Sequence, residues 1–263
     1  MKIHTILNIL AFTKNINRFI LIIKKIFRRF IKTSGKISNN QNINFLEKNC
    51  ENLENFFSNI DKDLWKKSKI FQNELNNYAK NILAQIEYDL GGGGAYNILY
   101  FLTKFTKPET IYETGVGAGF STFAFLKAMN ENEKGTLYSS DFPYFRIKNP
   151  ENYIGILVPQ NLKKRWKLMK EGDEANTKFY KKNINKKFDI LHYDSDKTYL
   201  GRSNFFKISR KLIDTKTIII MDDIQDNSFF YDFVNKNKLN RWKIFSFENK
   251  YVGMIYNSEF INF

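Results

Sequence analysis

Between residues 110 and 256, strand-length runs of hydrophobic residues alternate with stretches that have the 3.6-residue period of helices. Strands are predicted in five places, each of which runs into or ends at a carboxylate: 111–112, 135–141, 166–173, 188–196 and 217–223. Helical spacing follows the first, fourth and fifth of these strands. This alternation predicts a doubly wound, mostly parallel α/β sheet.

Two further strands, 242–247 and 251–256, are close enough in the chain to form a terminal hairpin. The expected domain is therefore a Rossmann-like, seven-stranded sheet within residues 91–263. In such sheets, ligands bind at the carboxyl ends of the strands. Five acidic residues are predicted along that edge: Glu113, Asp141, Asp173, Asp194 and Asp222. One acid at a strand end is ordinary, but five on one edge indicate a site.

A glycine-rich turn, which contains Gly115, Gly117 and Gly119, follows the first strand and precedes a helical pattern. Glycine lets backbone amides approach a ligand, and the start of a helix favours a negative group. The G-x-G-x-x-G spacing of dinucleotide folds is not met, because Phe120 occupies the third glycine position. Glu113, just before the turn, suits a ligand with an ammonium and a carboxylate, as in S-adenosylmethionine (SAM). A plain structural turn is the alternative.

The next two strand-end acids are candidates for contacts with the rest of such a cofactor. Asp141 lies roughly 20 residues after the turn, where a ribose-binding acid belongs in a Rossmann-like unit. Its two carboxylate oxygens can accept from both ribose hydroxyls, although an Asp that caps the next turn is the alternative. Asp173 is predicted at the end of the third strand, where a role near adenine and a solvated turn are equally open.

With these motifs in order, residues from about 91 to 257 resemble class I SAM-dependent methyltransferases. Glu113-Thr114-Gly115 and Asp194-Ser195-Asp196-Lys197-Thr198-Tyr199 resemble motifs of a bacterial group often encoded among cell-surface sugar or small-molecule biosynthesis functions. The layout is also similar to catechol-type O-methyltransferases, in which a Gly-Phe/Tyr-Ser motif places a serine hydroxyl on the SAM carboxylate. The matching residues are Gly119, Phe120 and Ser121. The resemblance implies SAM as the cofactor and methyl transfer as the reaction.

The same resemblance implies a magnesium site and a base. In catechol-type enzymes an Asp after the fourth strand and an Asp-Asn pair after the fifth hold Mg²⁺, and the matching positions are Asp194, Asp222 and Asp223. Asp223 stands where the family has Asn, which keeps an oxygen ligand and adds charge. Lys197 matches the lysine that acts there as the base. The bacterial group commonly has histidine at this position, so the resemblance leaves the identity of the base open.

The protein does not have to activate the methyl group, because the sulfonium of SAM is already an activated methyl donor. The enzyme has to hold the acceptor near attack distance and make its hydroxyl nucleophilic. Lys197 could take the hydroxyl proton if its pKa is depressed, and Mg²⁺ could lower the hydroxyl pKa instead. The alternatives are a solvated loop lysine and, for Asp222 and Asp223, a helix N-cap with an exposed acid. His192 is expected to be a packed core residue.

Composition favours an intracellular enzyme that acts on small molecules. The single cysteine, Cys50, excludes an intramolecular disulfide, a cysteine zinc cluster and the cysteine pair used for methylation of RNA base carbons. No Pro-Pro-Tyr-type motif follows the fourth strand, which argues against methylation of amino groups in DNA. The net charge of +15 partly reflects the many Lys residues typical of an AT-rich genome. Nucleic acid is not the expected partner, since interleaved aromatic and basic strand motifs are missing.

The N-terminal region has a different character. Residues 1–46 contain no Asp or Glu, and residues 3–32 are predicted to form a helix with one Ile- and Phe-rich face and one basic face. Its uncharged run is far shorter than the ~20 residues of a membrane span, and no small-residue cleavage site follows. The expected location is cytoplasmic, with the helix on an anionic membrane surface. Packing of the helix on the domain or on a second subunit of a homodimer is the alternative.

The predicted organisation has three parts: a basic amphipathic helix and linker at 1–44, a helical cap over the substrate mouth at 45–90, and the methyltransferase domain at 91–263. Gly91–Gly94 is either a hinge or a backbone surface near the cofactor. The leading hypothesis is an O-methyltransferase that acts on a sugar or another small hydroxyl acceptor, including a lipid-linked one. The alternatives are an inactive SAM-fold module at the membrane and an RNA methyltransferase.

Overall fold

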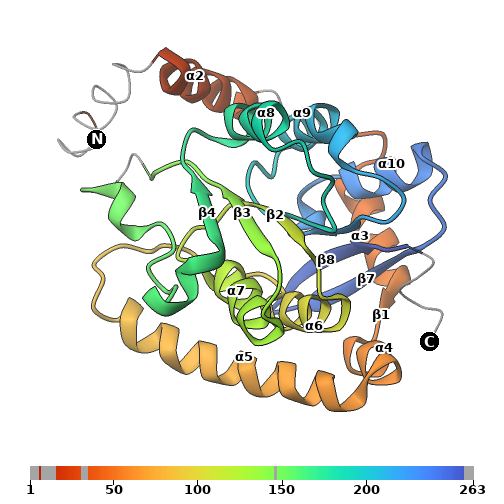
Figure 1. Cartoon of the computed structure of the whole chain (residues 1–263). Helices are drawn as coiled ribbons and strands as arrows, with labels where there is room; N and C mark the ends of the chain where they lie inside the picture. Colours follow the sequence, from red (N-terminus) through yellow and green to blue (C-terminus); the bar gives the residue numbers. More distant parts are fainter. Residues whose placement is uncertain (1–5, 7–15, 31–34, 145–146, 258–263) are drawn as a thin grey trace.

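The structure, a computed structural model, describes residues 6, 16–30, 35–144 and 147–257. Its centre is an eight-stranded sheet in the order β1-β7-β8-β6-β5-β2-β3-β4 (Figure 1). Strand β8 is antiparallel to β6 and β7, and the other neighbouring strands are parallel. The strands are β1 Cys50–Glu51, β2 Thr110–Thr114, β3 Thr136–Ser140, β4 Trp166–Met169, β5 Ile190–Tyr193, β6 Ile218–Met221, β7 Trp242–Phe247 and β8 Lys250–Ile255. The predicted doubly wound, mostly parallel α/β fold is confirmed.

Each of the seven predicted strands is present, and the structure adds an eighth, β1. This strand has only two residues, which pair with Ile244 and Phe245 of β7. Two residues are too few to produce a hydrophobic period. The sequence pattern therefore gave no indication of β1 inside the predicted helical cap.

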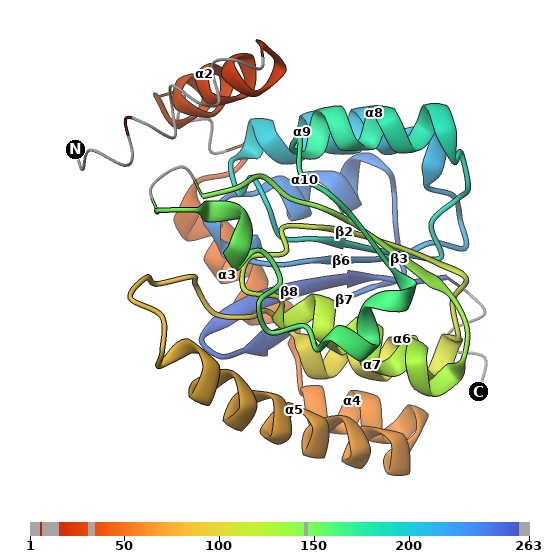
Figure 2. The ribbon, with the colours of Figure 1, turned by 60° about the vertical axis from the view of Figure 1, so that its left-hand side comes forward.

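Helices cover both faces of the sheet. In Figure 2, α8, α9 and α10 lie on one face, α6 and α7 lie on the other, and α4 and α5 lie outside α6 and α7. The helices are α2 Ile16–Phe30, α3 Asn39–Asn49, α4 Leu53–Ile60, α5 Lys62–Leu83, α6 Tyr96–Thr106, α7 Phe120–Asn132, α8 Asp173–Asn183, α9 Tyr199–Ser209 and α10 Phe229–Lys236. Short 3₁₀ helices are η1 Pro150–Tyr153, η2 Gln160–Arg165, η3 Arg210–Leu212 and η4 Ile224–Asp226.

The central strands are buried on both faces, as the continuous apolar runs predict. In β2, Ile111 joins the hydrophobic core beneath α6 and α7, whereas Tyr112 joins the core beneath α8 and α9. In β6, Ile220 and Ile219 divide in the same way. The alternation follows from the two-residue period of a strand.

The linker predicted between the helix 3–32 and residue 44 is too long, because α3 begins at Asn39. The cause is a capping box: the Ser38 hydroxyl accepts from the Gln41 backbone N–H, and the Gln41 side chain accepts from the Ser38 N–H. Leu46 then buries its side chain completely in the sheet core. The Ser-x-x-Gln motif was the available signal for this helix.

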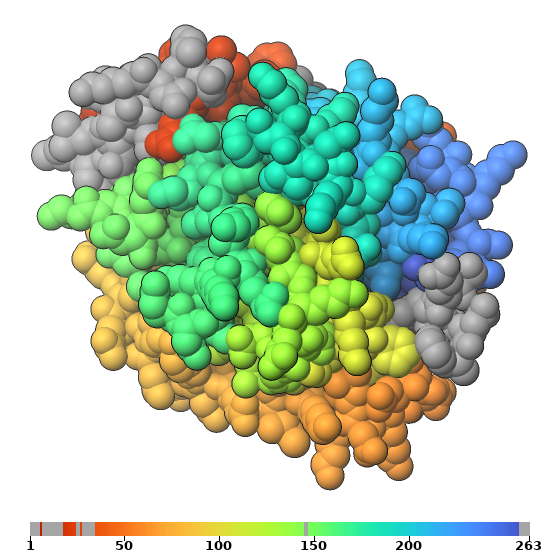
Figure 3. Space-filling model, in the orientation of Figure 1, coloured from red at the N-terminus to blue at the C-terminus, as the bar shows by residue number. Residues whose placement is uncertain are grey.

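Segment 45–90 is largely helical, and the last turns of α5 pack beside Ala118, which precedes α7. Helix α5 packs on α6, where the Phe71 ring stacks on Tyr100 with centroids 4.6 Å apart. It forms one edge of the molecule, coloured orange in Figure 3. Helices α4 and α5 therefore support the α6–α7 layer from outside.

Within the predicted helix 3–32, the structure describes α2 and Ile6, and the remaining residues lie outside the described part. One edge of α2 docks on the domain: Ile22 packs on Phe142, and Arg18 donates two hydrogen bonds to Glu171 at 2.8 and 2.5 Å. Another stripe stays exposed, with relative exposures of 37% to 63%: Phe19, Ile20, Ile23 and Phe27. None of the described helices is both long and apolar enough to cross a bilayer.

Candidate active site

A cavity of about 490 Å³ opens at the carboxyl ends of β2, β3 and β5. This volume lies within the usual range of small-molecule sites. Its wall combines the glycine turn after β2, the residues after β3, the loop after β5 and the chain before α6. The lining residues are Ile22, Leu90, Gly91–Gly94, Gly115–Ala118, Phe120, Ser121, Asp141–Tyr144, Asp194, Ser195, Lys197 and Lys250.

The predicted glycine turn is packed tightly against the loop that follows β5. Gly115 has a φ of +79°, and a Cβ on it would lie 2.1 Å from the carbonyl oxygen of Asp194. Gly119 has a φ of +102° and directly precedes α7. These positions need glycine both for the positive φ and for the close approach. The turn consequently presents backbone to the cavity.

Asp141 lies in the cavity, as predicted for a strand-end acid, and it holds the glycine turn in place. One carboxylate oxygen accepts from the backbone N–H groups of Val116 at 3.1 Å and Gly117 at 3.0 Å. The other accepts from the N–H of Phe142 at 2.6 Å. The ends of β2 and β3 are thereby joined at the cavity wall, and the ribose role stays a prediction.

Glu113 lies behind the turn and is absent from the cavity wall. Its fully buried carboxylate accepts hydrogen bonds from Ser121 at 2.5 Å, Ser139 at 2.6 Å and Thr122 at 2.8 Å. Burial raises the pKa of Glu113, although His192 and these hydroxyls oppose the shift. Glu113 therefore fastens the start of α7 to the sheet. Ser121 lines the cavity while its hydroxyl donates to Glu113.

The predicted position of Asp173 at the end of a strand is wrong. Strand β4 ends at Met169, and Asp173 is the first residue of α8. Its carboxylate accepts from the hydroxyls of Ser140 and Ser195, so it ties the end of β3 and the loop after β5 to α8. It does not line the cavity. The glycine at position 172, with a φ of +82°, ends the extended segment before α8 begins.

The loops after β5 and β6 form a charged cluster at the other end of the cavity. The Lys197 ammonium lies between two carboxylates, 3.2 Å from Asp194 Oδ1 and in closer contact with Asp223 Oδ2. Lys250 Nζ lies 3.7 Å from the other oxygen of Asp223. Burial and then the Asp222 carboxylate raise the pKa of Asp194 to about 7, with Lys197 opposing them. The cluster thus contains a cation beside a carboxyl that titrates near neutrality.

This environment does not favour Lys197 as the base. Burial alone would lower the pKa of Lys197, but Asp194 and Asp223 outweigh it and raise the pKa overall. A general base needs a free amine near neutral pH. In this arrangement the amine is protonated, which suits it to stabilise negative charge.

The carboxylates predicted to bind magnesium are brought to one edge but not into a shared coordination shell. Lys197 occupies the space between Asp194 and Asp223. Asp222 points instead toward Gly94, where a Cβ would lie 1.4 Å from Asp222 Oδ2. Among the described residues, no group of three or more Asp, Glu, His or Cys side chains is arranged to hold a metal ion. The carboxylate oxygens of Asp194 and Asp223, as they are arranged, fit the Lys197 ammonium and do not fit Mg²⁺.

His192 is fully buried, as expected of a core residue, but it lies between two acids. Its Nδ1 is 4.0 Å from Glu113 Oε1, and its Nε2 is 3.8 Å from Asp222 Oδ2. Burial lowers the pKa of His192, but Asp222 and the other nearby carboxylates raise it overall. The parallel register places Glu113 beside His192, and Asp222 follows the end of β6. Sequence reasoning identified all three residues and missed their proximity.

Three other parts of the wall lie outside the predicted site residues. Gly91–Gly94 lines the cavity, which is consistent with the predicted backbone surface near the cofactor. The Tyr144 hydroxyl donates to the Leu90 carbonyl at 3.2 Å across the cavity wall. Lys250 reaches the site from β8, far along the chain. A signal existed only for the glycine run.

Residues 112–224 match a family model described as a methyltransferase domain. The match begins in β2 and ends in η4, so it contains the glycine turn, Asp141 and all of the charged cluster except Lys250. This stretch of the chain is therefore similar to methyltransferase domains. No curated protein sequence matches the chain significantly.

Solved methyltransferases have the same fold as this domain. The O-methyltransferase from Bacillus cereus, in complex with SAH, is 13% identical with a TM-score of 0.51, and the match covers 81% of this chain and 100% of that one. TomG from Streptomyces achromogenes, an O-methyltransferase involved in tomaymycin synthesis and solved with SAM, is 10% identical with a TM-score of 0.50, covering 70% and 89%. A methyltransferase from Geobacter sulfurreducens is 14% identical with a TM-score of 0.51, covering 70% and 90%.

Proposed function

We propose that this methyltransferase transfers the methyl group of SAM to a hydroxyl of a small acceptor, such as a sugar. The observation that carries the proposal is the convergence of the glycine turn, Asp141 and the charged cluster of Asp194 and Lys197 on one cavity. The similar folds of the O-methyltransferases from Bacillus cereus and Streptomyces achromogenes, which were solved with SAH and SAM, support methyl transfer to a hydroxyl oxygen as the type of reaction.

The cavity fits SAM by its chemistry. Asp141 offers carboxylate oxygens for ribose hydroxyls, and the start of α7 behind Gly119 offers backbone N–H groups for the cofactor carboxylate. Ser121 lies in the same wall. Glu113 and Asp173 act from behind the wall by fixing the turn and the neighbouring loops. When bound, SAM supplies an activated methyl group, so the protein has to orient the acceptor and accept its proton.

We propose that Asp194 is the general base that accepts the proton of the acceptor hydroxyl. Its pKa of about 7 lies near physiological pH, where a general base is most effective. The adjacent Lys197 ammonium, 3.2 Å from Asp194 Oδ1, stabilises negative charge that develops on the acceptor oxygen. Asp223 holds Lys197 in place from the other side. No step through Mg²⁺ is assigned, because Lys197 stands between the carboxylates predicted to bind it.

An acceptor screen with methyl-labelled SAM tests this function. Calorimetry on the same sample, with NAD for comparison, reports cofactor binding independently of the acceptor. SAM binding with label transfer to a hydroxyl compound is the expected result. SAM binding without transfer to any acceptor class supports a binding module instead. A folded sample that binds NAD more tightly than SAM contradicts the cofactor assignment.

A second proposal concerns where the enzyme works. The docked edge of α2 leaves a stripe of four exposed apolar residues, Phe19, Ile20, Ile23 and Phe27, and the same helix is rich in Lys and Arg. We propose that this stripe contacts an anionic membrane surface on the cytoplasmic side while Arg18 and Ile22 stay on the domain. Each near-surface cation adds roughly 1 kcal/mol of attraction. In this proposal the helix has both predicted roles: one edge packs on the domain and another edge contacts the membrane.

Liposome flotation separates the two roles. The double variant Ile23→Glu/Phe27→Glu should lose binding to vesicles that contain phosphatidylserine. Phe179→Glu is the matched control, since Phe179 of α8 is also exposed, at 57%. Equal flotation of both variants and the parent chain would show that the stripe is not the contact. A homodimer that buries the stripe would appear as a concentration-dependent mass in ultracentrifugation, lost in the double variant only.

A further inference from the structure

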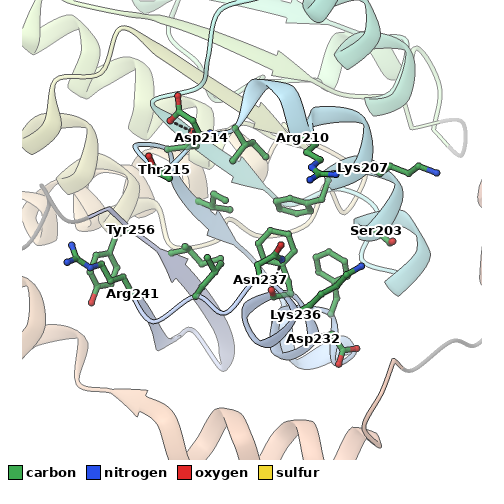
Figure 4. A pocket seen from close by; sticks show the side chains of 18 of the residues that line it. Ser203, Lys207, Arg210, Asp214, Thr215, Asp232, Lys236, Asn237, Arg241 and Tyr256 are labelled. Carbon is green, nitrogen blue, oxygen red and sulfur yellow. Dashed lines mark hydrogen bonds between the residues drawn. The ribbon is translucent and has the colours of Figure 1, made fainter.

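A second and larger cavity, about 950 Å³, lies between α9 and α10 on the flank of the sheet. Figure 4 shows Lys207 and Arg210 on the α9 side, Lys236 on the α10 side, and apolar side chains between the two helices. No residue lines both this groove and the cofactor cavity. The proposed methyl transfer therefore leaves the groove without a role.

The floor of the groove is apolar and firmly packed. The Phe206 and Phe233 rings lie 4.8 Å apart, and Phe229 lies 5.7 Å from Phe233. Ile219 of β6 and Ile255 of β8 also reach the floor and join the same core cluster. A floor anchored in the core is rigid enough to offer a preformed apolar surface.

The rim of the groove is positive. Five of the lining residues are exposed cations: Lys36, Lys207, Arg210, Lys236 and Arg241. None of these five side chains forms an ion pair or hydrogen bond with another described residue.

Two acids, Asp214 and Asp232, also line the groove, and they offset part of the positive charge, because a hydrogen bond from a neutral group does not cancel the charge of a carboxylate. Asp232 accepts from the Tyr199 hydroxyl at 2.9 Å and the Ser228 hydroxyl at 3.0 Å. Asp214 accepts from the backbone N–H of Lys216 at 2.9 Å. Five cations against two acids (5 − 2) leave the groove lining with a net charge of +3.

We propose that this groove binds one anionic amphiphile, with a single hydrocarbon chain on the aromatic floor and a phosphate or carboxylate head among the rim cations. The charge of the rim selects the negative head, and the floor selects the chain. Size also favours such a molecule: at ~30 Å³ for each water-sized group, the volume holds roughly 30 non-hydrogen atoms.

The test uses the full chain and dodecyl phosphate below its critical micelle concentration, with dodecyl maltoside as the uncharged partner of equal chain length. Binding is measured by calorimetry. Lys207→Glu/Arg210→Glu reverses two rim charges, and Lys182→Glu/Lys186→Glu makes the same charge change on the exposed segment before β5. Ser203→Trp, on the α9 wall, fills the groove without changing charge. SAM binding by each variant confirms that it is folded.

Saturable binding of one dodecyl phosphate for each chain is expected, with weaker binding of the maltoside. The rim reversal should weaken dodecyl phosphate binding roughly tenfold, and the control pair should leave it within about twofold. Equal effects of the two double variants, or equal binding of the two amphiphiles, would overturn the proposal. Rim-dependent binding to phosphatidylglycerol vesicles with no binding of the monomer would also overturn it, in favour of a bilayer-docking surface.

Discussion

Replacement of Gly115 by Ala tests whether the glycine turn and the loop that carries Asp194 form one packed unit. The new Cβ would lie 2.1 Å from the Asp194 carbonyl oxygen, and the residue would keep a φ of +79°. Gly91 provides a close control, because its φ is +77° and an added Cβ has no atom within 4 Å. The two substitutions share the backbone strain and differ in the clash.

The magnitudes follow from these two contributions. A left-handed conformation costs an alanine about 1–2 kcal/mol, and the reduced entropy of the unfolded chain returns roughly 0.4–1 kcal/mol at either position. Overpacking adds about 1–3 kcal/mol at Gly115 alone, because the Asp194 loop has to move. We expect Gly91→Ala to lower the free energy of unfolding by roughly 1 kcal/mol and Gly115→Ala by about 2–4 kcal/mol.

Urea unfolding followed by circular dichroism measures the difference directly. Thermal unfolding should show it as a larger fall in Tm for Gly115→Ala, at about 2–4 °C for each kcal/mol in a domain of this size. The acceptor reaction should also slow in Gly115→Ala, since the clash displaces Asp194. Equal losses of stability in the two variants would refute the packing of the turn on the Asp194 loop.

Four further predictions address the site. Because the Asp194 pKa is raised to about 7, kcat/KM should rise with pH through about 7 as the carboxylate forms, and Asp194→Asn should abolish this rise, as a pH–rate profile would show. Lys197 lowers the pKa of Asp194, so Lys197→Met should move the rise to higher pH and Lys197→Arg should restore it; an unchanged midpoint contradicts the pairing. Turnover should persist in excess chelator, and restoration of a lost rate by Mg²⁺ alone would return the metal to the mechanism. Asp141→Ala should weaken SAM binding at least tenfold in calorimetry, because the carboxylate both holds the turn and faces the cofactor cavity; unchanged affinity would place SAM elsewhere.

Local pattern in the sequence was sufficient for most of the fold. Continuous apolar runs such as 218–221 predict strands buried on both faces, and the structure has β6 between two cores. The glycine spacing after β2 predicts the strand–turn–helix unit because positive φ values are a local property of the chain. The misplaced boundaries were local too: the capping box at Ser38 and the start of α8 at Asp173 both had signals nearby.

What the sequence could not specify are contacts between segments far apart in the chain. That Lys197 is flanked by Asp194 and Asp223 depends on how the loops after β5 and β6 are folded, and this alone decides the direction of its pKa shift. Glu113 was recognised as important, but its burial behind the turn follows from the register of β2, β3 and β5. Electrostatic shifts and cavities depend on distances of a few ångströms between remote residues. The sequence by itself determined the sheet and the residues at its edge, whereas only tertiary packing decided which of them line the cavity, which lie behind it and which neutralise one another.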